Sequence, residues 1–321
     1  MTKPETKPAR SYPNTAFLEE TVRRAARSRP VHGAILRVEN GEGSLAWTTA
    51  ARYLTPDQQY HIASVTKLYV TVVVLRLRDE GRLSLDDPIG RYLAADLIQG
   101  LYVLNGVDRS DEITILHLIS NASAPSRPGS DPGNPARSTT PTRTTNSWAA
   151  SIETVTGQPI AEVFQQTIFE ELDLDDTYAF SDPADTRPAP MFYKDAPLHV
   201  PRYIASVAAE GGIISTTADT MRFTKAFSTG HFFPPETINE LKRWNRIFFP
   251  GQFDFGIGLE KQWVPWILSP LAPIGELLGF WGQSGGGHGH GARHEGGAMT
   301  VGGGRLPLRR GRLLHGWTQQ R

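Results

Sequence analysis

The chain has 321 residues, with 33 Lys and Arg balanced by 33 Asp and Glu, and no cysteine. Without thiols it can hold neither a disulfide-stapled module nor a cysteine-ligated zinc domain, and zero net charge gives the whole chain no general attraction for nucleic acid or acidic lipid. The length suits one large domain, or a core domain with an inserted subdomain, and is enough to bury a sizeable core.

The N-terminal residues 1–13 are polar and basic and lack the apolar stretch of a secretory signal. The longest apolar run, residues 68–77, is interrupted by Thr71 and Arg76 and falls short of the roughly 18 apolar residues of a membrane span. We therefore expect no membrane span and, unless a leader precedes this sequence, a cytoplasmic location.

Taken in chain order, the first expected element is a helix that begins at Thr15 and ends near Pro30, because its apolar residues recur at helical spacing. Residues 32–38 and 44–49 follow as two strands joined by a glycine-containing turn. Further helices are expected over 64–80, after the cap residue Thr114, and over 147–156, 159–172 and 217–227, with strands over 177–180, 212–215 and 255–262.

Strands at both ends with helices between them predict an α+β fold. In this fold the terminal strands share one sheet, and residues of roughly 83–210 form a helical subdomain. We expect a polar N-terminal tail over residues 1–13 and one domain over residues 14–285.

Two stretches differ from ordinary globular composition. Residues 121–146 contain no large apolar side chain, so we expect a disordered loop there, because such a segment cannot offset the entropy lost on ordering. Residues 286–321 are rich in glycine and then in arginine, and we expect an irregular tail. Its His288, His290, His294 and Glu295 offer metal-ligand chemistry and its arginines could bind a polyanion, but glycines on nearly every side leave those ligands unsupported, so we expect no metal site.

The strongest chemical signal is Ser64-Val65-Thr66-Lys67 at the start of an apolar helix. Three residues apart, the hydroxyl and the amine lie on one helical face. A serine hydroxyl needs a neighbouring base to become a nucleophile, and a lysine can be that base only in its neutral form, which burial among apolar residues favours. The helix N-terminus adds partial positive charge that would stabilise a developing oxyanion near Ser64.

The sequence around this motif resembles the serine β-lactamase-related family, which groups class C β-lactamases, DD-carboxypeptidases, D-aminopeptidases and related esterases. The resemblance is carried, in the family's order, by Tyr60 to Lys67, Asp79 to Ile89 (Asp-Glu-Gly-Arg-Leu-Ser-Leu-Asp-Asp-Pro-Ile), Ile113 to Ser120, Glu153 to Gly157, Ile168 to Leu172, and Glu210 to Thr216. These segments span most of residues 14 to 285.

The resemblance implies a β-lactamase/transpeptidase-like fold: an antiparallel sheet flanked by helices, with a helical subdomain. It implies that Ser64 is the acylated nucleophile and Lys67 its base, with the N–H groups of Ser64 and Gly286 as the oxyanion hole. Gln283, Ser284 and Gly285 would line the substrate side. It requires no cofactor, and it implies a small-molecule or peptide-like substrate, with no nucleic acid as partner; the oligomeric state stays open.

At two of the family's motifs, this sequence departs from the family's pattern. The Tyr-x-Asn element falls on Thr140 and Thr142, and a threonine hydroxyl is a poor proton relay. The Lys-Thr-Gly element falls on Gln283-Ser284-Gly285, where glutamine supplies a hydrogen bond but no charge. Three readings follow: a serine hydrolase that acts through an acyl-enzyme on an ester, amide or D-amino-acid peptide-like bond; a catalytically impaired or non-enzymatic family member; or a scaffold whose tail binds metal or polyanion.

One hypothesis, a change of reading frame in the gene, would explain both departures from the family pattern. Read one base out of register, residues 140–144 are compatible with Tyr-Thr-Asp-Thr-Asn, and residues 309–320 with a series typical of the family's final strand. Both places coincide with unusual Pro-, Arg- or Gly-rich composition. A resequenced gene with a clean open frame in both places would remove this hypothesis.

Overall fold

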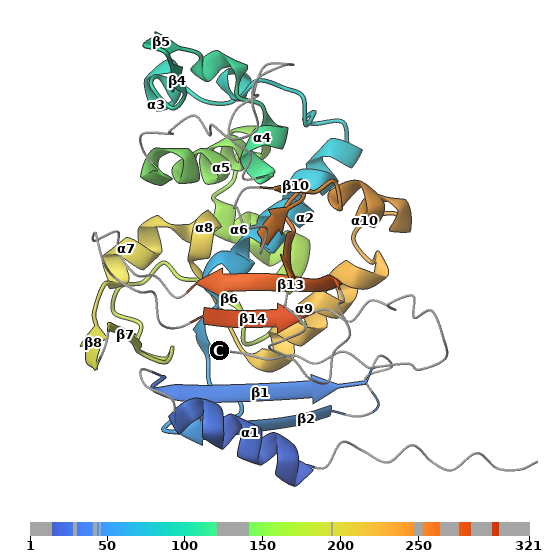
Figure 1. Cartoon of the computed structure of the whole chain (residues 1–321). Coiled ribbons are helices and arrows are strands. Elements are labelled where there is room, and N and C mark those ends of the chain that lie inside the picture. Colours follow the sequence, from blue (N-terminus) through green and yellow to red (C-terminus); the bar gives the residue numbers. More distant parts are fainter. Residues whose placement is uncertain are drawn as a thin grey trace, which may run out of the picture.

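The computed structural model describes residues 15–27, 31–40, 44, 46–120, 141–193, 195–246, 253–263, 276–283 and 297–301. Its helices and antiparallel strands form an α+β fold, which confirms the fold class predicted from the sequence (Figure 1). In that view a mainly helical part lies at the top, a hairpin of two long strands lies at the bottom, and further strands lie between them.

The N-terminal helix and hairpin form one layer. α1 (Thr15–Arg27) packs against β1 (Gly33–Glu39) and β2 (Ala46–Arg52), which pair antiparallel. Apolar residues at helical spacing on α1 meet apolar residues of the hairpin in a separate buried cluster of Leu18, Val22, Ala26, Ala34, Leu36 and Ala51. The expected first helix and hairpin are therefore confirmed.

The second sheet lies toward the end of the chain. Its strands are antiparallel and follow chain order: β10 (Asn245–Arg246), β11 (Phe253–Phe255), β12 (Glu260–Trp263), β13 (Glu276–Gln283) and β14 (Gly297–Val301). The single strand expected over 255–262 is wrong, because the chain turns after Phe255 and makes two paired strands. β14 falls within the expected tail 286–321, so the domain extends beyond residue 285; flanking glycines hide this strand in the sequence.

The terminal strands were expected to share one sheet, and this expectation is wrong for the described residues. There, β1 and β2 form one ladder and β10 to β14 form another. α9 (Thr217–Thr229) contacts both β1 and β14, and its Lys225 forms an ion pair with Glu39 of β1. Among the described residues, the helix α9 connects the two sheets by contacting both of them.

The long helix expected from Ser64 begins as one 3-10 turn, η1 (Ala63–Val65), and continues as α2 (Thr66–Asp79). α2 is buried over most of its surface, as its continuous run of apolar residues predicts. It ends just before Gly81, whose φ of +69° is a left-handed conformation that glycine adopts without steric cost.

The region expected as a helical subdomain contains most of the shorter helices. They are α3 (Ala95–Ile98), α4 (Ile115–Ile119), α5 (Pro141–Thr156), α6 (Ile160–Phe164), α7 (Pro201–Ser206) and α8 (Ala208–Gly211), with single turns η2 (Ile89–Arg91), η3 (Ser110–Glu112) and η4 (Gln165–Phe169). Thr114 caps α4 as expected. α5 begins at Pro141 rather than at Ser147, which suits proline at a first helical position, so residues 141–146 of the expected disordered loop are helical. Residues 121–140 lie outside the described part.

A small three-stranded sheet positions the segment that leads into Ser64. Its order is β3 (Tyr60–His61), β9 (Ile213–Ser215) and β6 (Tyr178–Ala179). The remaining elements are the hairpins β4 (Val103–Leu104) with β5 (Val107–Asp108) and β7 (Met191–Tyr193) with β8 (Ala196–Leu198), and the helix α10 (Pro235–Leu241). None of the helices among the described residues is long and apolar enough to cross a membrane.

Candidate active site

The structure brings Ser64 and Lys67 together. Ser64 lies in η1 and Lys67 in the first turn of α2, and the Lys67 Nζ donates a hydrogen bond to the Ser64 Oγ at 2.9 Å. Both side chains are half-buried. One turn later, the Thr71 hydroxyl donates to the Lys67 carbonyl oxygen at 2.8 Å, which supports the helix at this point. The proximity predicted from the i, i+3 spacing is present; the chemical roles of the two residues stay predictions.

The backbone before Ser64 is held in an uncommon conformation. Ala63 has a φ of +49°, which a residue with a β-carbon rarely adopts without support. That support comes from β9, because the Ile62 N–H donates to the Ile213 carbonyl oxygen at 3.1 Å and β3 pairs with β9. Gly211 lies against the Ala63 backbone, and a β-carbon there would stand 3.4 Å from Ala63 Cα. The segment from Gly211 to Ile213 thus fixes the turn that presents Ser64.

Glu210 adds a second partner for Lys67. The Lys67 Nζ donates to the Glu210 carbonyl oxygen at 3.4 Å across 143 residues of sequence. The Glu210 side chain is half-buried, and this burial raises the pKa of its carboxyl group, while the charge of Lys67 acts in the opposite direction. No local sequence pattern singles out Glu210 as a site residue, although it precedes the paired glycines of a segment that carries the family resemblance.

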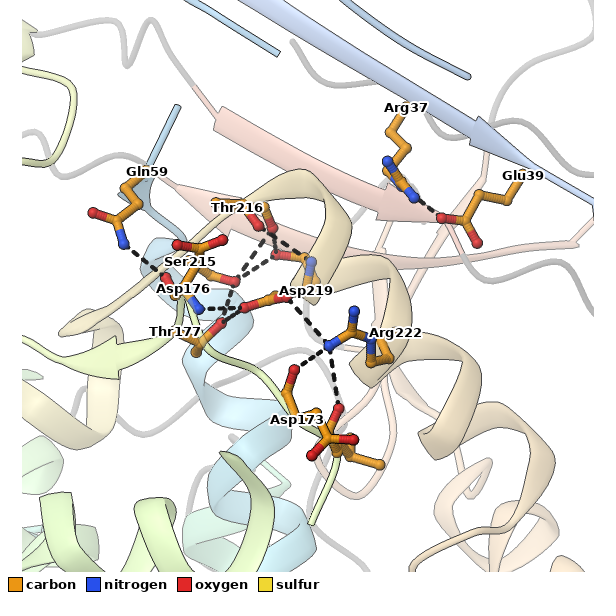
Figure 2. Close-up of polar contacts among 12 residues, drawn as sticks. Arg37, Glu39, Gln59, Asp173, Asp176, Thr177, Ser215, Thr216, Asp219 and Arg222 are labelled. Carbon is orange, nitrogen blue, oxygen red and sulfur yellow. Dashed lines mark hydrogen bonds and ion pairs between the residues drawn. The ribbon is translucent and has the colours of Figure 1, made fainter. Parts of the chain in front are cut away.

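A buried polar network also supports β9, through the hydroxyl group of Ser215 (Figure 2). Asp219, in the first turn of α9, accepts hydrogen bonds from the Asp176 N–H at 3.0 Å and from the Thr177 hydroxyl at 2.9 Å. The Thr177 hydroxyl also lies 2.8 Å from the Ser215 hydroxyl on β9. Burial raises the pKa of Asp219, and its hydrogen bonds oppose that change. The network therefore ties β9 to α9 and to the start of β6, and Ser215 pairs with Tyr60 of β3.

His61 lies on β3, three residues before Ser64. Burial lowers its pKa to about 4, and Asp185 opposes that shift. The His61 ring packs edge-on against the Phe180 ring with 5.5 Å between centroids, and its Nδ1 is buried with no hydrogen-bond partner among the described residues. His61 is therefore neutral near pH 7 and contributes packing on the strand that leads into Ser64.

The other predicted site residues lie at or beyond the edge of the described structure. β13 ends at Gln283, and its backbone contacts η1, which carries Ser64. Thr142 lies in the first turn of α5, and α5 contacts both α2 and α8. Ser284, Gly285, Gly286 and Thr140 lie outside the described residues. Two of the predicted segments thus lie on elements near the Ser64–Lys67 pair.

The metal-ligand alternative falls outside the described structure as well, because His288, His290, His294 and Glu295 all lie there. Among the residues that the structure describes, no group of three or more histidine, aspartate or glutamate side chains could hold a metal ion.

Comparison with known proteins identifies relatives of this chain. A family model described as Beta-lactamase matches residues 18–299. The D-alanyl-D-alanine-carboxypeptidase/endopeptidase AmpH of Escherichia coli is 25% identical over 235 residues, which cover 64% of this chain and 57% of AmpH. The monacolin J acid methylbutanoyltransferase of Aspergillus terreus is 28% identical over 129 residues, which cover 33% of this chain and 31% of the transferase. The chain thus spans well under two thirds of either relative.

Solved structures show the same fold. A D-stereospecific amidohydrolase from Streptomyces sp. superposes with a TM-score of 0.67 at 21% identity, covering 90% of this chain and 91% of that one. This likeness confirms the β-lactamase/transpeptidase-like fold expected from the sequence. The family match over residues 18–299, which is most of the sequence, shows that the chain belongs to the β-lactamase family.

Proposed function

We propose that this protein is a serine hydrolase that forms an acyl-enzyme on an ester, an amide or a D-amino-acid peptide-like bond. The observation that carries the proposal is the 2.9 Å contact between the Ser64 hydroxyl and the Lys67 amine at the start of a buried helix. A hydroxyl in direct contact with a base is the arrangement that nucleophilic catalysis requires.

In the acylation step, neutral Lys67 takes the Ser64 proton while Oγ bonds to the carbonyl carbon of the substrate. The proton on Lys67 then passes to the leaving group as its bond to the carbonyl carbon breaks. The Ser64 N–H and the partial positive charge of the helix start face the developing oxyanion. The N–H of Gly286 stays proposed as the second donor of the oxyanion hole, and Gln283, Ser284 and Gly285 stay proposed for the substrate side. The contact of β13 with η1 supports this placement.

The substrate class comes from the relatives. AmpH is named for cleaving a peptide between D-alanines, the Streptomyces protein for D-stereospecific amide hydrolysis, and the Aspergillus protein for acyl transfer. We therefore place the substrate of this chain among small acyl or peptide-like compounds, with water or an alcohol as the acyl acceptor.

The test is covalent labelling with a fluorescent penicillin, combined with turnover of a p-nitrophenyl ester, for the wild type and for Ser64→Ala. We expect labelling and turnover that both disappear in Ser64→Ala. Labelling without turnover would indicate an impaired enzyme that acylates but does not deacylate. If the wild type shows neither, the hydrolase proposal is wrong.

A further inference from the structure

One residue of β9 holds the chain on both sides of Ser64. The Ile213 carbonyl oxygen accepts a hydrogen bond from the Ile62 N–H at 3.1 Å, and the Ile213 N–H donates to the Thr66 hydroxyl at 3.4 Å. Both Ile213 and Thr66 are fully buried. The residues two before and two after the proposed nucleophile are therefore attached to the same residue of β9, so a shift of this strand would move Ser64.

The segment just before β9 also reaches the proposed base. The Lys67 Nζ donates to the Glu210 carbonyl oxygen at 3.4 Å, and Gly211 lies against the Ala63 backbone. The placement of both members of the Ser64–Lys67 pair thus depends on where residues 210–213 lie.

The position of β9 depends in turn on a chain of buried hydroxyl groups that ends on Asp219 (Figure 2). The Thr177 Oγ1 lies 2.9 Å from the Asp219 carboxylate and 2.8 Å from the Ser215 Oγ. Because an ionised carboxylate only accepts, the single hydroxyl hydrogen of Thr177 goes to Asp219, and the Ser215 hydroxyl donates to Thr177. All three residues are buried, where a polar group left without a partner is costly. The chain of hydrogen bonds therefore fixes Ser215, the last residue of β9.

The same carboxylate also acts on β3. It accepts the Asp176 N–H at 3.0 Å, and the Asp176 carbonyl oxygen accepts a hydrogen bond from the Gln59 side-chain amide at 3.1 Å. Gln59 directly precedes β3, the strand that leads into Ser64. Asp219 is thus linked to the turn that presents Ser64 by two routes, through Ser215 on β9 and through Gln59 before β3.

We propose that Asp219 and Thr177 are positioning residues for acylation, which act through β9 and β3 to hold the Ser64 hydroxyl where it can attack a substrate carbonyl. This inference rests on the proposed function, in which Ser64 is the nucleophile. The Ser64 proton still passes to Lys67 as the Oγ–carbon bond forms. The rate of such a step is sensitive to placement, because a displacement of about 1 Å costs on the order of 100-fold.

The test compares the rate constant and the final extent of labelling by a fluorescent penicillin in the full chain. Thr177→Val removes the hydroxyl and keeps the shape, so the rate constant should fall by about 10-fold or more. Thr177→Ser keeps the hydroxyl and should label at close to the wild-type rate constant. The final extent reports the folded fraction, so a merely structural role would lower the extent and leave the rate constant unchanged. A wild-type rate constant in Thr177→Val would overturn the proposal.

Thr224→Val is the matched control. Thr224 is a buried threonine of α9 whose hydroxyl donates within its own helix, to the Thr220 carbonyl oxygen at 2.7 Å. This variant should label with the wild-type rate constant, and a loss equal to that of Thr177→Val would count against a specific role of the network. Should Thr177→Val not fold, Ser215→Ala removes the other hydroxyl of the chain and provides the same comparison.

Amide hydrogen exchange gives a readout that does not depend on catalysis. In Thr177→Val the Ile62 N–H, which bonds to Ile213, should lose more protection than the N–H of Leu75, a buried residue of α2, because the loosening is local. Equal losses at the two amides would indicate a general loss of stability and overturn the proposal. Local loosening in a chain whose wild type never labels Ser64 would instead support the hold of the network on this turn and contradict the hydrolase.

Discussion

Gly258 lies directly on Thr71, so that a β-carbon on Gly258 would overlap the Thr71 side chain. Thr71 is one turn after Lys67 on α2 and donates its hydroxyl to the Lys67 carbonyl oxygen. The Gly258 N–H donates to the Ile119 carbonyl oxygen at 2.8 Å. The turn between β11 and β12 thus packs onto the helix that carries the proposed base.

Gly258→Ala should therefore destabilise the protein by about 3 kcal/mol, because it combines a positive φ with overpacking. Urea unfolding followed by circular dichroism measures the effect. Gly81→Ala is the matched control, since Gly81 has a similar positive φ but nothing within 4 Å of its position for a β-carbon. It should lose only about 1 to 2 kcal/mol, the steric contribution of the left-handed conformation. Equal losses for the two variants would contradict the packing argument.

Lys67→Arg tests the requirement for a base. A guanidinium keeps the positive charge but does not become neutral in proteins, so penicillin labelling of Ser64 should fall by about 100-fold or more. Lys225→Arg is the control. Lys225 forms an ion pair with Glu39 of β1, which arginine keeps, and neither residue is a predicted site residue. Labelling of Lys67→Arg at the wild-type rate would show that Lys67 is not the base.

His61 should make stability depend on pH between about 6.5 and 4. Burial lowers its pKa in the folded protein to about 4, while an exposed histidine titrates near 6.5, so the unfolded chain binds the proton first as pH falls. The stability that comes from keeping His61 neutral is therefore fully present above this window and is lost as the pH falls through it. The free energy of unfolding should decrease by on the order of 2 kcal/mol between pH 7 and pH 5. Urea midpoints at the two pH values measure the change.

His61→Asn should reduce this pH dependence, whereas His199→Asn should retain it, since His199 is exposed. Because other groups also titrate in this range, the comparison is between variants and not with a flat profile. A His61→Asn variant with the same acid sensitivity as the wild type would contradict the assignment.

Tyr69→Phe should keep or increase stability. The Tyr69 ring stacks on Phe223 with 3.6 Å between centroids, but its buried hydroxyl has no hydrogen-bond partner among the described residues. Removal of an unsatisfied buried hydroxyl should add about 1 kcal/mol to the free energy of unfolding. The comparison variant is Tyr178→Phe, which loses a hydrogen bond from the Tyr178 hydroxyl to Asp185 and should be less stable. A marked loss in Tyr69→Phe would reveal a partner for that hydroxyl.

Several element boundaries could be predicted from sequence because they depend on local chemistry. Thr114 caps α4, and glycine ends α2 at residue 81. Prediction was wrong where local signals conflict. Residues 255–262 have a strand pattern, but their glycines permit the turn that separates β11 from β12. Polar residues before Ser147 hid the first turn of α5.

The Ser64–Lys67 pair was determined by the sequence, because i, i+3 spacing on a helix places two side chains on one face whatever the rest of the chain does. The likeness of the surrounding segments to the β-lactamase family likewise needed no coordinates. The surroundings of the pair were decided by tertiary structure. Glu210 reaches Lys67 across 143 residues, and β9 supports the strained Ala63 from a similar separation. Such contacts depend on how distant elements pack, which no local pattern encodes.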